Sequence, residues 1–407
     1  MTSGVTAPRG FRAAGVAAGL KSGGGRDVAL VVNDGPESAA AGVFTRNRVK
    51  AAPVRWSEQV LRGGSVRAVV LNSGGANACT GPAGFQDTHA TAEHTATQLA
   101  VFGAGEVGAG EVAVCSTGLI GQRLPLGRLV AGVTEAAAQL ATTGAAAAAE
   151  AIMTTDTCPK QVAVAVSGDQ SRLVEPAISA GPADFTVGGM AKGAGMLAPD
   201  LATMLCVLTT DALADPAELT AALRAAVEVS FERLDSDGCL STNDTVLLLA
   251  SGASGVRPAP AQLTSAVTTA CQDLVRQLLA DAEGATKQIG ITVSQAASEA
   301  EAVTVARAVA RSNLVKTAVF GNDPNWGRIL AAVGTTDAAF DPDALDVAVN
   351  GVWVCRAGAA AAERSTVDLG GPEVSIEIAL HAGAAAATVW TNDLTHGYVH
   401  ENSAYSS

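Results

Sequence analysis

Short apolar segments that alternate with helical ones constrain the fold of this chain most. The clearest apolar segments are 28–32, 68–71, 112–115 and 246–249. Their length and β-branched content are typical of buried strands. Segments with helical periodicity, such as 88–100 and 219–229, lie between them. This order predicts a mixed α/β (α+β) fold, and 407 residues of which 48% are hydrophobic suffice for more than one core.

The segment 192–211 joins a glycine-rich basic loop to an apolar run. Gly193 and Gly195 permit unusual backbone angles, and Pro199 fixes its own φ. The apolar run that follows, 204–208, predicts a buried strand. By local composition alone, this is a loop that enters a core strand, with a threonine at the boundary.

A cut before Thr203 would change the chemistry of that threonine. A side-chain hydroxyl stays protonated at neutral pH and needs a base within hydrogen-bond reach to act as a nucleophile. The α-amine of an N-terminal residue has a pKa of about 7.7–8.0 and is tethered to the carbon that bears the hydroxyl. Cleavage of the Ala202–Thr203 bond would therefore put nucleophile and base into one residue. Local sequence leaves this role and a plain strand entry both open.

The loop KGAGM, its proline-containing spacer and the following ATML and TTDA closely resemble the processing site of the ornithine acetyltransferases, also called bifunctional arginine-biosynthesis proteins. Further motifs of that family occur in the expected order along nearly the whole chain. They are GVFTRNRVKAAPV at 42–54, LNSGGANACTG at 71–81, CSTGLIG at 115–121, MTTD at 153–156, STNDTVLLL at 241–249, DAEGATK at 281–287, KTAVFGNDPNWGRIL at 316–330 and ENSAYSS at 401–407.

This resemblance implies β-sheets layered between helices and self-cleavage at Ala202–Thr203, as in N-terminal-nucleophile enzymes. The cut would separate an α-chain, 1–202, from a β-chain, 203–407, that begins with the nucleophile. It would lie inside the fold and not at a domain boundary. The fragments should stay together, because the strand after the cut is too apolar to be left exposed. An α2β2 heterotetramer is implied by the resemblance alone.

The implied activity is transfer of acetyl from N2-acetyl-L-ornithine to L-glutamate in arginine biosynthesis, that of a glutamate N-acetyltransferase. Thr203 would take the acetyl group, release ornithine and pass acetyl to glutamate in a ping-pong course. Acetyl-CoA as a second donor would add amino-acid N-acetyltransferase activity. That second activity stays open, because the sequence contains no legible CoA-binding motif. We expect no cofactor.

Oxyanion donors are predicted next to the apolar segment 112–115. Ser116, Thr117 and Gly118 follow it and supply hydroxyl groups and an unobstructed glycine N–H. Local sequence by itself favours a strand-ending turn here. In the resembled family the matching Thr-Gly pair forms the oxyanion hole, which implies that role for Thr117 and Gly118.

The resemblance also implies a set of substrate contacts, which are Thr154, Lys192, Thr203, Glu283, Asn402 and Ser407. A lysine suits the carboxylate of an amino-acid substrate, and a glutamate suits its cationic amine. Lys192 and Glu283 therefore match a zwitterionic ligand.

Each of these positions has a structural alternative. Thr154 could cap a turn with Asp156, and Glu283 could lie on a solvated helix face. The residues 402–407 could form a frayed tail, as most C-termini do. Whether Thr154 or Thr155 makes the contact stays open.

Two rival functions also stay open. The same nucleophile could hydrolyse its acyl-enzyme, which would make the chain an N-terminal-threonine amidase or aminopeptidase. An unprocessed metabolite-binding protein could instead use the glycine-rich loops as a cradle. A GxGxxG pattern at 103–108 follows a helix-like segment and has no acidic residue near position 128, so we predict a turn there and not a dinucleotide site.

Net charge and cysteine content limit the binding partners and the cellular location that we expect for this chain. A net charge of −13 argues against nucleic acid and an anionic membrane surface. The seven cysteines lack a CxxC pair, which indicates reduced, mostly buried thiols, and the histidines form no metal-binding pattern. The first residues contain no continuous apolar run of a signal peptide. We expect a cytoplasmic protein that binds small amino-acid substrates without a metal.

Overall fold

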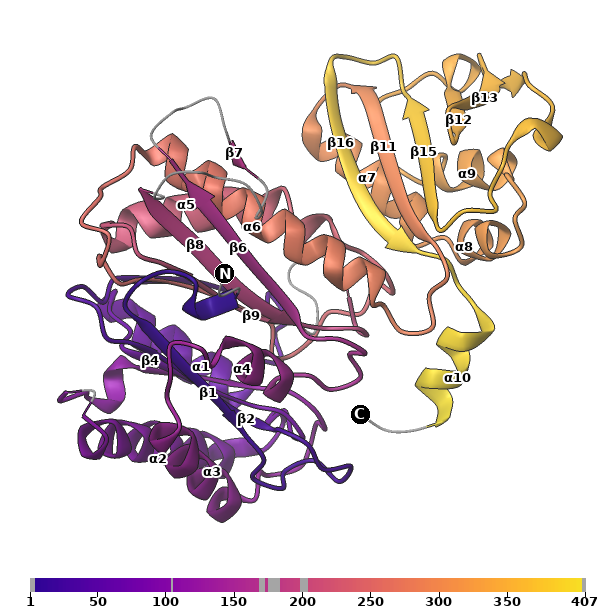
Figure 1. Ribbon diagram of the computed structural model, residues 1–407. Coiled ribbons are helices and arrows are strands. Elements are labelled where there is room, and N and C mark those ends of the chain that lie inside the picture. The colour runs from indigo at the N-terminus through magenta and orange to yellow at the C-terminus, as the bar shows by residue number, and fades with distance from the viewer. Residues whose placement is uncertain (1–3, 104, 168–172, 175–183, 198–203, 405–407) are drawn as a thin grey trace.

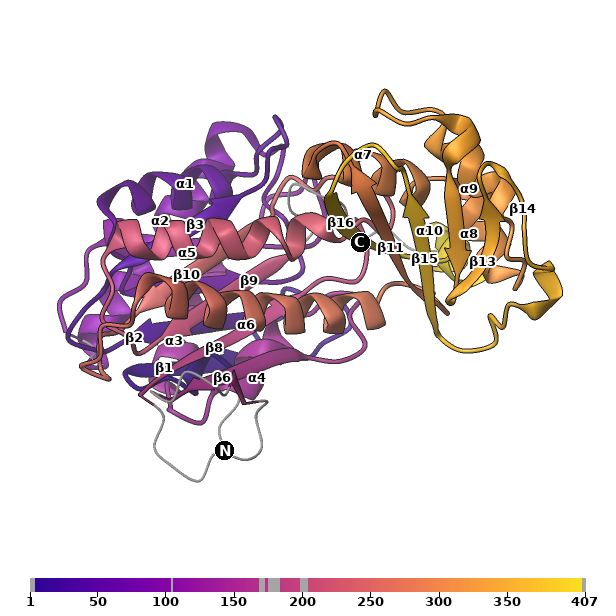
Figure 2. The same cartoon turned by 90° about the horizontal axis from the view of Figure 1, so that it is seen from above.

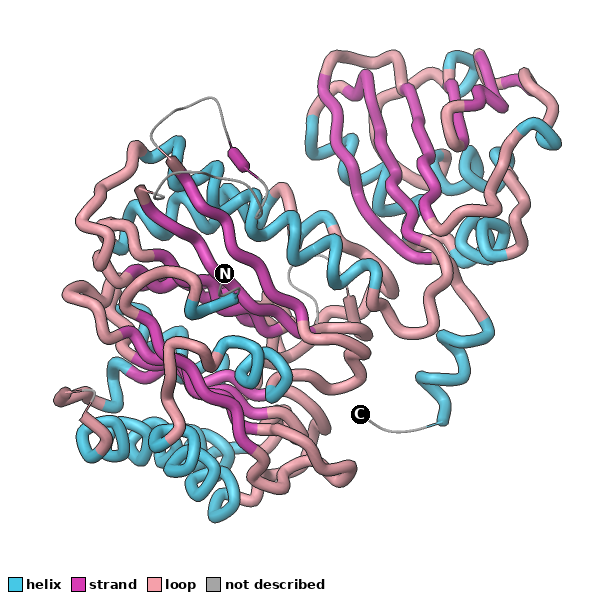
Figure 3. Tube along the Cα trace, viewed as in Figure 1, coloured by secondary structure: helices cyan, strands magenta, loops and turns pink. Residues whose placement is uncertain are grey.

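The structure is a computed structural model that describes residues 4–103, 105–167, 173–174, 184–197 and 204–404. Its strands form three sheets with helices packed against them (Figure 1 and Figure 3). The strands are β1 Phe11–Val16, β2 Val28–Asn33, β3 Ala40–Phe44, β4 Ala68–Asn72, β5 Val112–Ser116, β6 Lys160–Val166, β7 Leu173–Val174, β8 Phe185–Lys192, β9 Leu205–Thr210, β10 Thr245–Ala250, β11 Gln288–Ala296, β12 Asp346–Val349, β13 Val352–Arg356, β14 Ala359–Ala360, β15 Glu373–Ala379 and β16 Ala385–Asn392. The helices are α1 Ala52–Val60, α2 Gly81–Val101, α3 Leu126–Ala138, α4 Ala145–Ala151, α5 Pro216–Glu228, α6 Pro260–Ala280, α7 Glu299–Ala310, α8 Asn313–Phe320, α9 Trp326–Val333 and α10 His396–Ala404.

Two of the sheets stack face to face. One has the strand order β1-β2-β4-β5 and the other the order β3-β10-β9-β8-β6-β7. Apolar side chains fill the space between them, including Val31 and Leu71 from the first sheet and Met190, Val207 and Leu247 from the second. Full burial of each large side chain favours folding by about 1.5–3 kcal/mol, so this interface holds the two sheets together.

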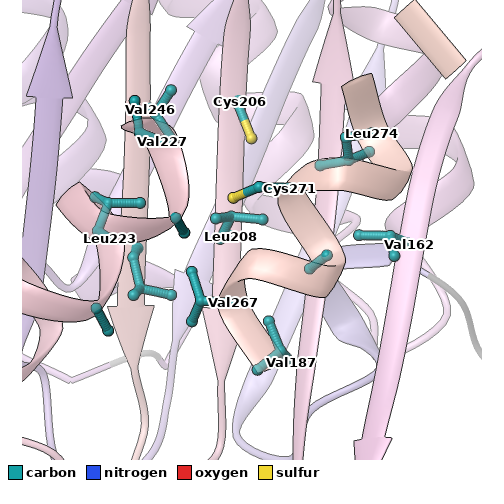
Figure 4. Close-up of a cluster of buried hydrophobic side chains, with 14 of the residues drawn as sticks. Val162, Val187, Cys206, Leu208, Leu223, Val227, Val246, Val267, Cys271 and Leu274 are labelled. Carbon is teal, nitrogen blue, oxygen red and sulfur yellow. The ribbon is translucent and has the colours of Figure 1, made fainter. Parts of the chain in front are cut away.

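Helices cover the two outer faces of this stack. Helices α2 and α3 pack on the four-stranded sheet, where Leu99 and Val133 meet Val70. Helices α5 and α6 lie across the six-stranded sheet (Figure 2), and Figure 4 shows Cys271 of α6 beside Leu208 of β9. The result is a four-layer arrangement of helix, sheet, sheet and helix. The prediction of β-sheets sandwiched by helices is thereby confirmed.

The third sheet belongs to a separate unit with its own core. Its order is β14-β13-β12-β15-β11-β16, and α7, α8 and α9 cover one of its faces. Buried and exposed residues alternate along β15, which is typical of a sheet with a single covered face. After β16 the chain returns through α10, which in Figure 1 lies below this unit and toward the stacked sheets.

The expected elements lie where the sequence places them. The four clearest apolar segments fall within β2, β4, β5 and β10. The helical segment 88–100 falls within α2, and 219–229 covers α5 except its first three residues and ends one residue after it. Every residue of β9 is buried, as a continuous apolar run predicts. The GxGxxG segment connects a helix, α2, to a strand, β5, and its described residues form no strand-to-helix turn. The prediction of a turn there is confirmed.

Strand pairing brings distant segments to one end of the stacked sheets. In the parallel pair β4–β5, Asn72 lies opposite Ser116. In the other sheet Leu205 at the start of β9 pairs with Lys192 of β8 on one side and Thr245 of β10 on the other. The sequence-predicted cleavage point lies in the connection from β8 to β9, at residues 198–203, outside the described residues.

Two general properties concern the described part of the chain. None of its helices is long and apolar enough to cross a membrane.

All seven cysteines are free thiols, and four of them, at positions 115, 206, 271 and 355, are buried. The prediction of unpaired, mostly buried cysteines is confirmed.

Candidate active site

A cavity of about 110 Å³ lies where these strand ends meet. It gathers sequence-predicted site residues from separate segments, which are Thr117, Gly118, Thr154, Lys192, Glu283 and Asn402. Ala202, Thr203 and Ser407 lie outside the described residues. Thr203 directly precedes Met204, where the description of the chain resumes beside β9.

Lys192 places a buried positive charge in this cavity. It is the last residue of β8 and is 2% exposed. Its Nζ donates a hydrogen bond to Thr117 Oγ1 at 3.5 Å and lies 3.9 Å from Asp156 Oδ2. Burial lowers the pKa of Lys192, and the carboxylate of Asp156 opposes this change. A buried ammonium group of this kind attracts a substrate carboxylate strongly, because water screens it little.

Asp156 is the anion that compensates this charge. Its Oδ1 accepts hydrogen bonds from Lys160 Nζ at 2.6 Å and from Gly193 N at 2.7 Å. Burial alone would raise the pKa of Asp156, but Lys192, Lys160 and the Gly193 N–H together lower it to about 2. Lys160 is itself fully buried and also contacts Asp281 at 2.5 Å. This buried network connects β6, β8 and the end of α6.

Thr154 caps a turn, as one of its sequence-based alternatives predicts, and it also lines the cavity. In this turn its backbone N–H donates to Asp156 Oδ2 at 3.0 Å. Thr155 lines the same cavity. The geometry therefore leaves either threonine within reach of a ligand.

Thr117 offers its side chain, and not its backbone, as a donor. Its N–H is used in a hydrogen bond of 3.0 Å to Asn72 O. Its Oγ1 accepts from Lys192, so the hydroxyl hydrogen is available to a second acceptor. A neighbouring ammonium group polarises this hydroxyl and strengthens it as a donor.

Gly118 has a conformation that strongly favours glycine. Its φ is +124°, and a Cβ at this position would lie 2.6 Å from Gly75 N and 2.7 Å from Gly74 C. Two backbone segments, 74–75 and 117–118, therefore pack closely together here. Such close packing fixes the peptide groups here, as an oxyanion site requires.

Glu283 and Asn402 form the opposite wall of the cavity. Glu283 lies in the turn after α6 and its N–H donates to Ala194 O at 2.9 Å. Asn402 Nδ2 donates to Glu283 Oε2 at 3.0 Å. Gly195 leaves room for this carboxylate, because a Cβ there would lie 2.5 Å from Glu283 Oε2. Glu283 thus lies off the helix face considered above, and Asn402 belongs to a helix, α10, and not to a frayed tail.

Asn243 and Asp244 are site residues that sequence reasoning missed. Asn243 Nδ2 donates to Ala76 O at 2.6 Å and to Ser116 O at 2.8 Å, which ties together the ends of the two stacked sheets. Asp244 Oδ1 accepts from Met204 N at 3.0 Å. The one available signal was a pair of polar residues directly before an apolar strand.

Asp244 is a carboxyl group beside the start of β9. It is fully buried, and its Oδ2 has no hydrogen-bond partner among the described residues. Burial raises its pKa well above the ordinary value. The hydrogen bond from Met204 N and the charge of Lys192 oppose this rise.

A larger cavity, of about 810 Å³, lies between α6 and the open face of the third sheet. Its lining includes Val275, Gly290 and Trp390 and none of the described site residues that the sequence predicts. The chemistry of the molecule is therefore concentrated in the smaller cavity.

Comparison with known proteins agrees with this arrangement of residues. The model of the ArgJ family matches residues 12–407. An arginine biosynthesis bifunctional protein ArgJ from Thermobifida fusca is 60% identical over 403 residues, which span 99% of this chain and 100% of the relative. The chain belongs to the ArgJ family. The ArgJ protein of Mycobacterium tuberculosis strain H37Rv is 58% identical over 406 residues, or 99% of this chain and 96% of its own.

Two solved structures of ArgJ-type proteins are also similar. Ornithine acetyltransferase from Mycobacterium tuberculosis, solved in complex with ornithine, has 60% sequence identity and a TM-score of 0.43, and the match covers 49% of this chain and 95% of that one. The ArgJ protein of Bacillus halodurans has 34% identity and a TM-score of 0.45, with 48% and 97% covered. The family model and the curated relatives confirm the resemblance inferred from sequence motifs, and this ArgJ-family chain is an enzyme of arginine biosynthesis, an acetyltransferase.

Proposed function

We propose that this ArgJ-family enzyme transfers acetyl from N2-acetyl-L-ornithine to L-glutamate through an acetyl ester of Thr203. The supporting observation is one cavity whose lining brings together a buried lysine, a glutamate and two candidate oxyanion donors. Lys192 suits the carboxylate that both amino-acid substrates carry, and Glu283 suits a cationic amine. Thr203 directly precedes Met204, whose N–H donates to Asp244, the neighbour of the cavity-lining Asn243.

Maturation begins with attack of Thr203 Oγ on the Ala202 carbonyl carbon. The peptide C–N bond breaks as an ester forms, which frees the α-amine of Thr203, and water then hydrolyses the ester to free the Thr203 hydroxyl and the Ala202 carboxylate. The hydrogen bond from Met204 N to Asp244 supports this step, because it fixes the amide that follows Thr203. The resulting α-chain, 1–202, and β-chain, 203–407, stay joined through β8 and β9, which are paired strands.

In turnover, the free amine of Thr203 accepts the proton of its own hydroxyl as Oγ attacks the acetyl carbonyl. The Thr117 hydroxyl and the Gly118 N–H stabilise the oxyanion, and Lys192 disfavours protonation of a nearby amine. Ornithine takes the proton and leaves. The amine of glutamate then attacks the ester, which gives N-acetylglutamate and restores Thr203.

Transfer must outrun hydrolysis of the acetyl-enzyme, because water is abundant. Positioning of the acceptor amine can be worth several kcal/mol of barrier, on the order of 7–11 kcal/mol at best. Incubation of the purified enzyme with acetylornithine and glutamate tests this point, and we expect N-acetylglutamate and ornithine in equal amounts. Acetate without N-acetylglutamate would instead identify an amidase or aminopeptidase.

Self-cleavage is tested on a denaturing gel. We expect two fragments of about half the 40.4 kDa of the whole chain. The variant Thr203→Ala should stay uncut, and cleavage at the same bond in that variant would remove Thr203 from the maturation scheme. A single uncut band from the parent protein would favour the unprocessed metabolite-binding protein.

Several finer properties belong to the same proposal. Acetyl-CoA is a second donor, in keeping with the word bifunctional in the names of the relatives. The enzyme is an α2β2 heterotetramer in the cytoplasm, where the free thiols would stay reduced. The chemistry needs no metal or other cofactor, since nucleophile, base and oxyanion donors are all protein groups.

A further inference from the structure

A second, larger cavity continues from the candidate active site. It measures about 690 Å³ and shares Gly118, Thr154 and Thr155 with the smaller one. The two cavities therefore meet at a proposed oxyanion donor. A volume of several hundred Å³ is typical of a site for a ligand much larger than an amino acid.

The wall of this cavity is built by a fixed loop. The fully buried carboxylate of Asp27 accepts hydrogen bonds from Leu20 N at 2.6 Å and Lys21 N at 3.2 Å. The loop packs on Gly74, where a Cβ would lie 2.8 Å from Leu20 O. Gly74 in turn packs against Gly118. Backbone contacts thus lead without interruption from the oxyanion donor to Lys21.

Positive side chains predominate along this wall, although the whole chain has a net charge of −13. Lys21, Arg26 and Arg123 line the cavity, with Glu150 as the acid among its lining residues. Arg123 is held by Asp87, and Arg26 forms a solvent-exposed ion pair with Glu150 at 3.0 Å.

Lys21 differs from the two arginines. Its Nζ donates to the backbone oxygen of Arg26 at 2.8 Å, and it forms no ion pair within the described part of the chain. Burial lowers its pKa, and the charges of Asp27, Asp156 and Lys192 also act on it. Lys21 is therefore electrostatically close to the active site and has N–H groups left for an anion.

We propose that this cavity binds the phosphate-bearing carrier of an acyl thioester, so that its acyl group reaches Thr203 past Gly118. The inference rests on the proposed function and adds the location of a second donor. Lysine and arginine side chains and glycine-rich backbone are the usual partners of phosphate, and 22–25 is a Ser-Gly-Gly-Gly run. An amino-acid donor is held by the smaller cavity and needs none of these groups.

The chemical step is the same acylation with another leaving group. Thr203 Oγ attacks the thioester carbonyl, the C–S bond breaks, and the α-amine passes the hydroxyl proton to the departing thiolate. The products are acetyl-Thr203 and a free thiol. Both donors thus give one intermediate, which glutamate then deacylates.

Kinetics of the mature enzyme with two donors test the site. We expect the double variant Lys21→Ala, Arg26→Ala to raise the KM for acetyl-CoA about a hundredfold, because each of the two charged hydrogen bonds to phosphate contributes roughly a factor of ten. The KM and kcat for acetylornithine should not change. Arg62→Ala, which removes an exposed arginine outside the cavity, is the matched control and should affect neither donor.

A thioester without phosphate distinguishes carrier binding from acyl transfer. S-acetyl-N-acetylcysteamine should be used equally by the parent and the double variant. An unchanged KM for acetyl-CoA in the double variant would overturn the inference, and so would equal losses with acetylornithine and acetyl-CoA. A parent enzyme that uses acetylornithine but neither uses acetyl-CoA nor is inhibited by CoA would also overturn it and leave the proposed function standing. Failure with acetylornithine would contradict the proposed function itself.

Discussion

The charge of Lys192 depends on one carboxylate. Asp156 contacts both Lys192 and Lys160, and all three side chains are almost completely buried. Transfer of such charges from water is costly, and close opposite charges together with good hydrogen bonds offset that cost. Asp281 also contacts Lys160, but among these acids Asp156 alone contacts Lys192.

Removal of this carboxylate charge should therefore destabilise the fold. We expect Asp156→Asn to lower the free energy of unfolding by about 3–5 kcal/mol, because a buried positive charge loses its partner. Urea denaturation measures this quantity. Asp34→Asn is the control, since Asp34 pairs with Arg12 at the surface and should cost less than about 1 kcal/mol. Equal effects of the two substitutions would contradict the role of Asp156.

Asp156 also predicts a dependence of stability on pH. Its pKa in the folded protein is about 2, below the ordinary value of 3.8, so the ionised form favours folding. This contribution is fully present above the ordinary pKa and is lost as the pH falls through about 2. We expect the difference in unfolding free energy between parent and Asp156→Asn to shrink by about 2 kcal/mol from roughly pH 4 to roughly pH 2. A constant difference over that window would show that Asp156 does not titrate there.

Thr117 should act through its hydroxyl. We expect Thr117→Val to lower kcat with acetylornithine about a hundredfold or more, since one oxyanion donor is worth roughly 3 kcal/mol of barrier. The KM should change little. Thr117→Ser keeps the hydroxyl and should keep most of the activity. Similar losses in both variants would indicate a packing role for the threonine.

Helix α10 is the element that completes the site. No residue of this helix is buried, and it is held by a few polar contacts, including Thr395 Oγ1 to Gly284 O at 2.6 Å. Gly284 has a φ of +61°, and a Cβ there would collide with the backbone of Gly397 and Tyr398. The position of Asn402 thus depends on a glycine in the turn that carries Glu283.

Gly284→Ala should displace α10 from the site. We expect kcat/KM for acetylornithine to fall about tenfold, as loss of a hydrogen bond to a charged group predicts. Gly351→Ala is the matched control, because Gly351 has a φ of +77° and open space around it. It should share the backbone strain, roughly 1 kcal/mol of stability, without the loss of activity. Equal kinetics of the two variants would contradict a role for α10.

At the scale of elements, apolar runs in the sequence predicted where the strands lie. They did not predict which strands pair with one another in a sheet. Strand β9 is buried on both faces, so it shows as a continuous apolar run in the sequence. Nothing local indicates that β3 pairs with β10, about 200 residues later, because register depends on how the whole sheet packs.

The same limit applies to the site. The family motifs pointed to Lys192 and Glu283. Asp244 lies in the motif at 241–249, but its local sequence does not indicate its contacts, and Lys21 lies in none of the motifs. Asp244 becomes a candidate site residue because it contacts Met204. That contact exists only after β9 and β10 pair in parallel. Lys21 becomes a candidate binding residue because it lines a cavity that four separate segments form.

At the scale of the whole molecule, the two units are joined close to the site. Ser236 Oγ donates to Asn392 Oδ1 at 2.5 Å, and Arg311 contacts the buried Asp235 at 2.8 Å. Helix α10 follows directly after β16 of the second unit. The second unit therefore sets the position of Asn402, although the nucleophile belongs to the first.

The pairing of β8 with β9 affects how readily the cleaved protein refolds after it has been unfolded. After a cut in their connection, the two strands remain neighbours but belong to different polypeptides. Unfolding of the mature enzyme then releases two molecules, so that refolding becomes a second-order reaction and its yield depends on protein concentration. The lone α-chain would also present β8 as an unpaired edge, which favours aggregation.

Refolding from urea at several concentrations measures this difference. We expect a tenfold dilution to slow recovery of the mature enzyme about tenfold, as a second-order step requires. The uncut Thr203→Ala chain should recover its native fluorescence at a rate independent of dilution. Identical behaviour of the two would show that the fragments do not separate. After cleavage, slow unfolding would therefore maintain the native state more than the free energy of unfolding does.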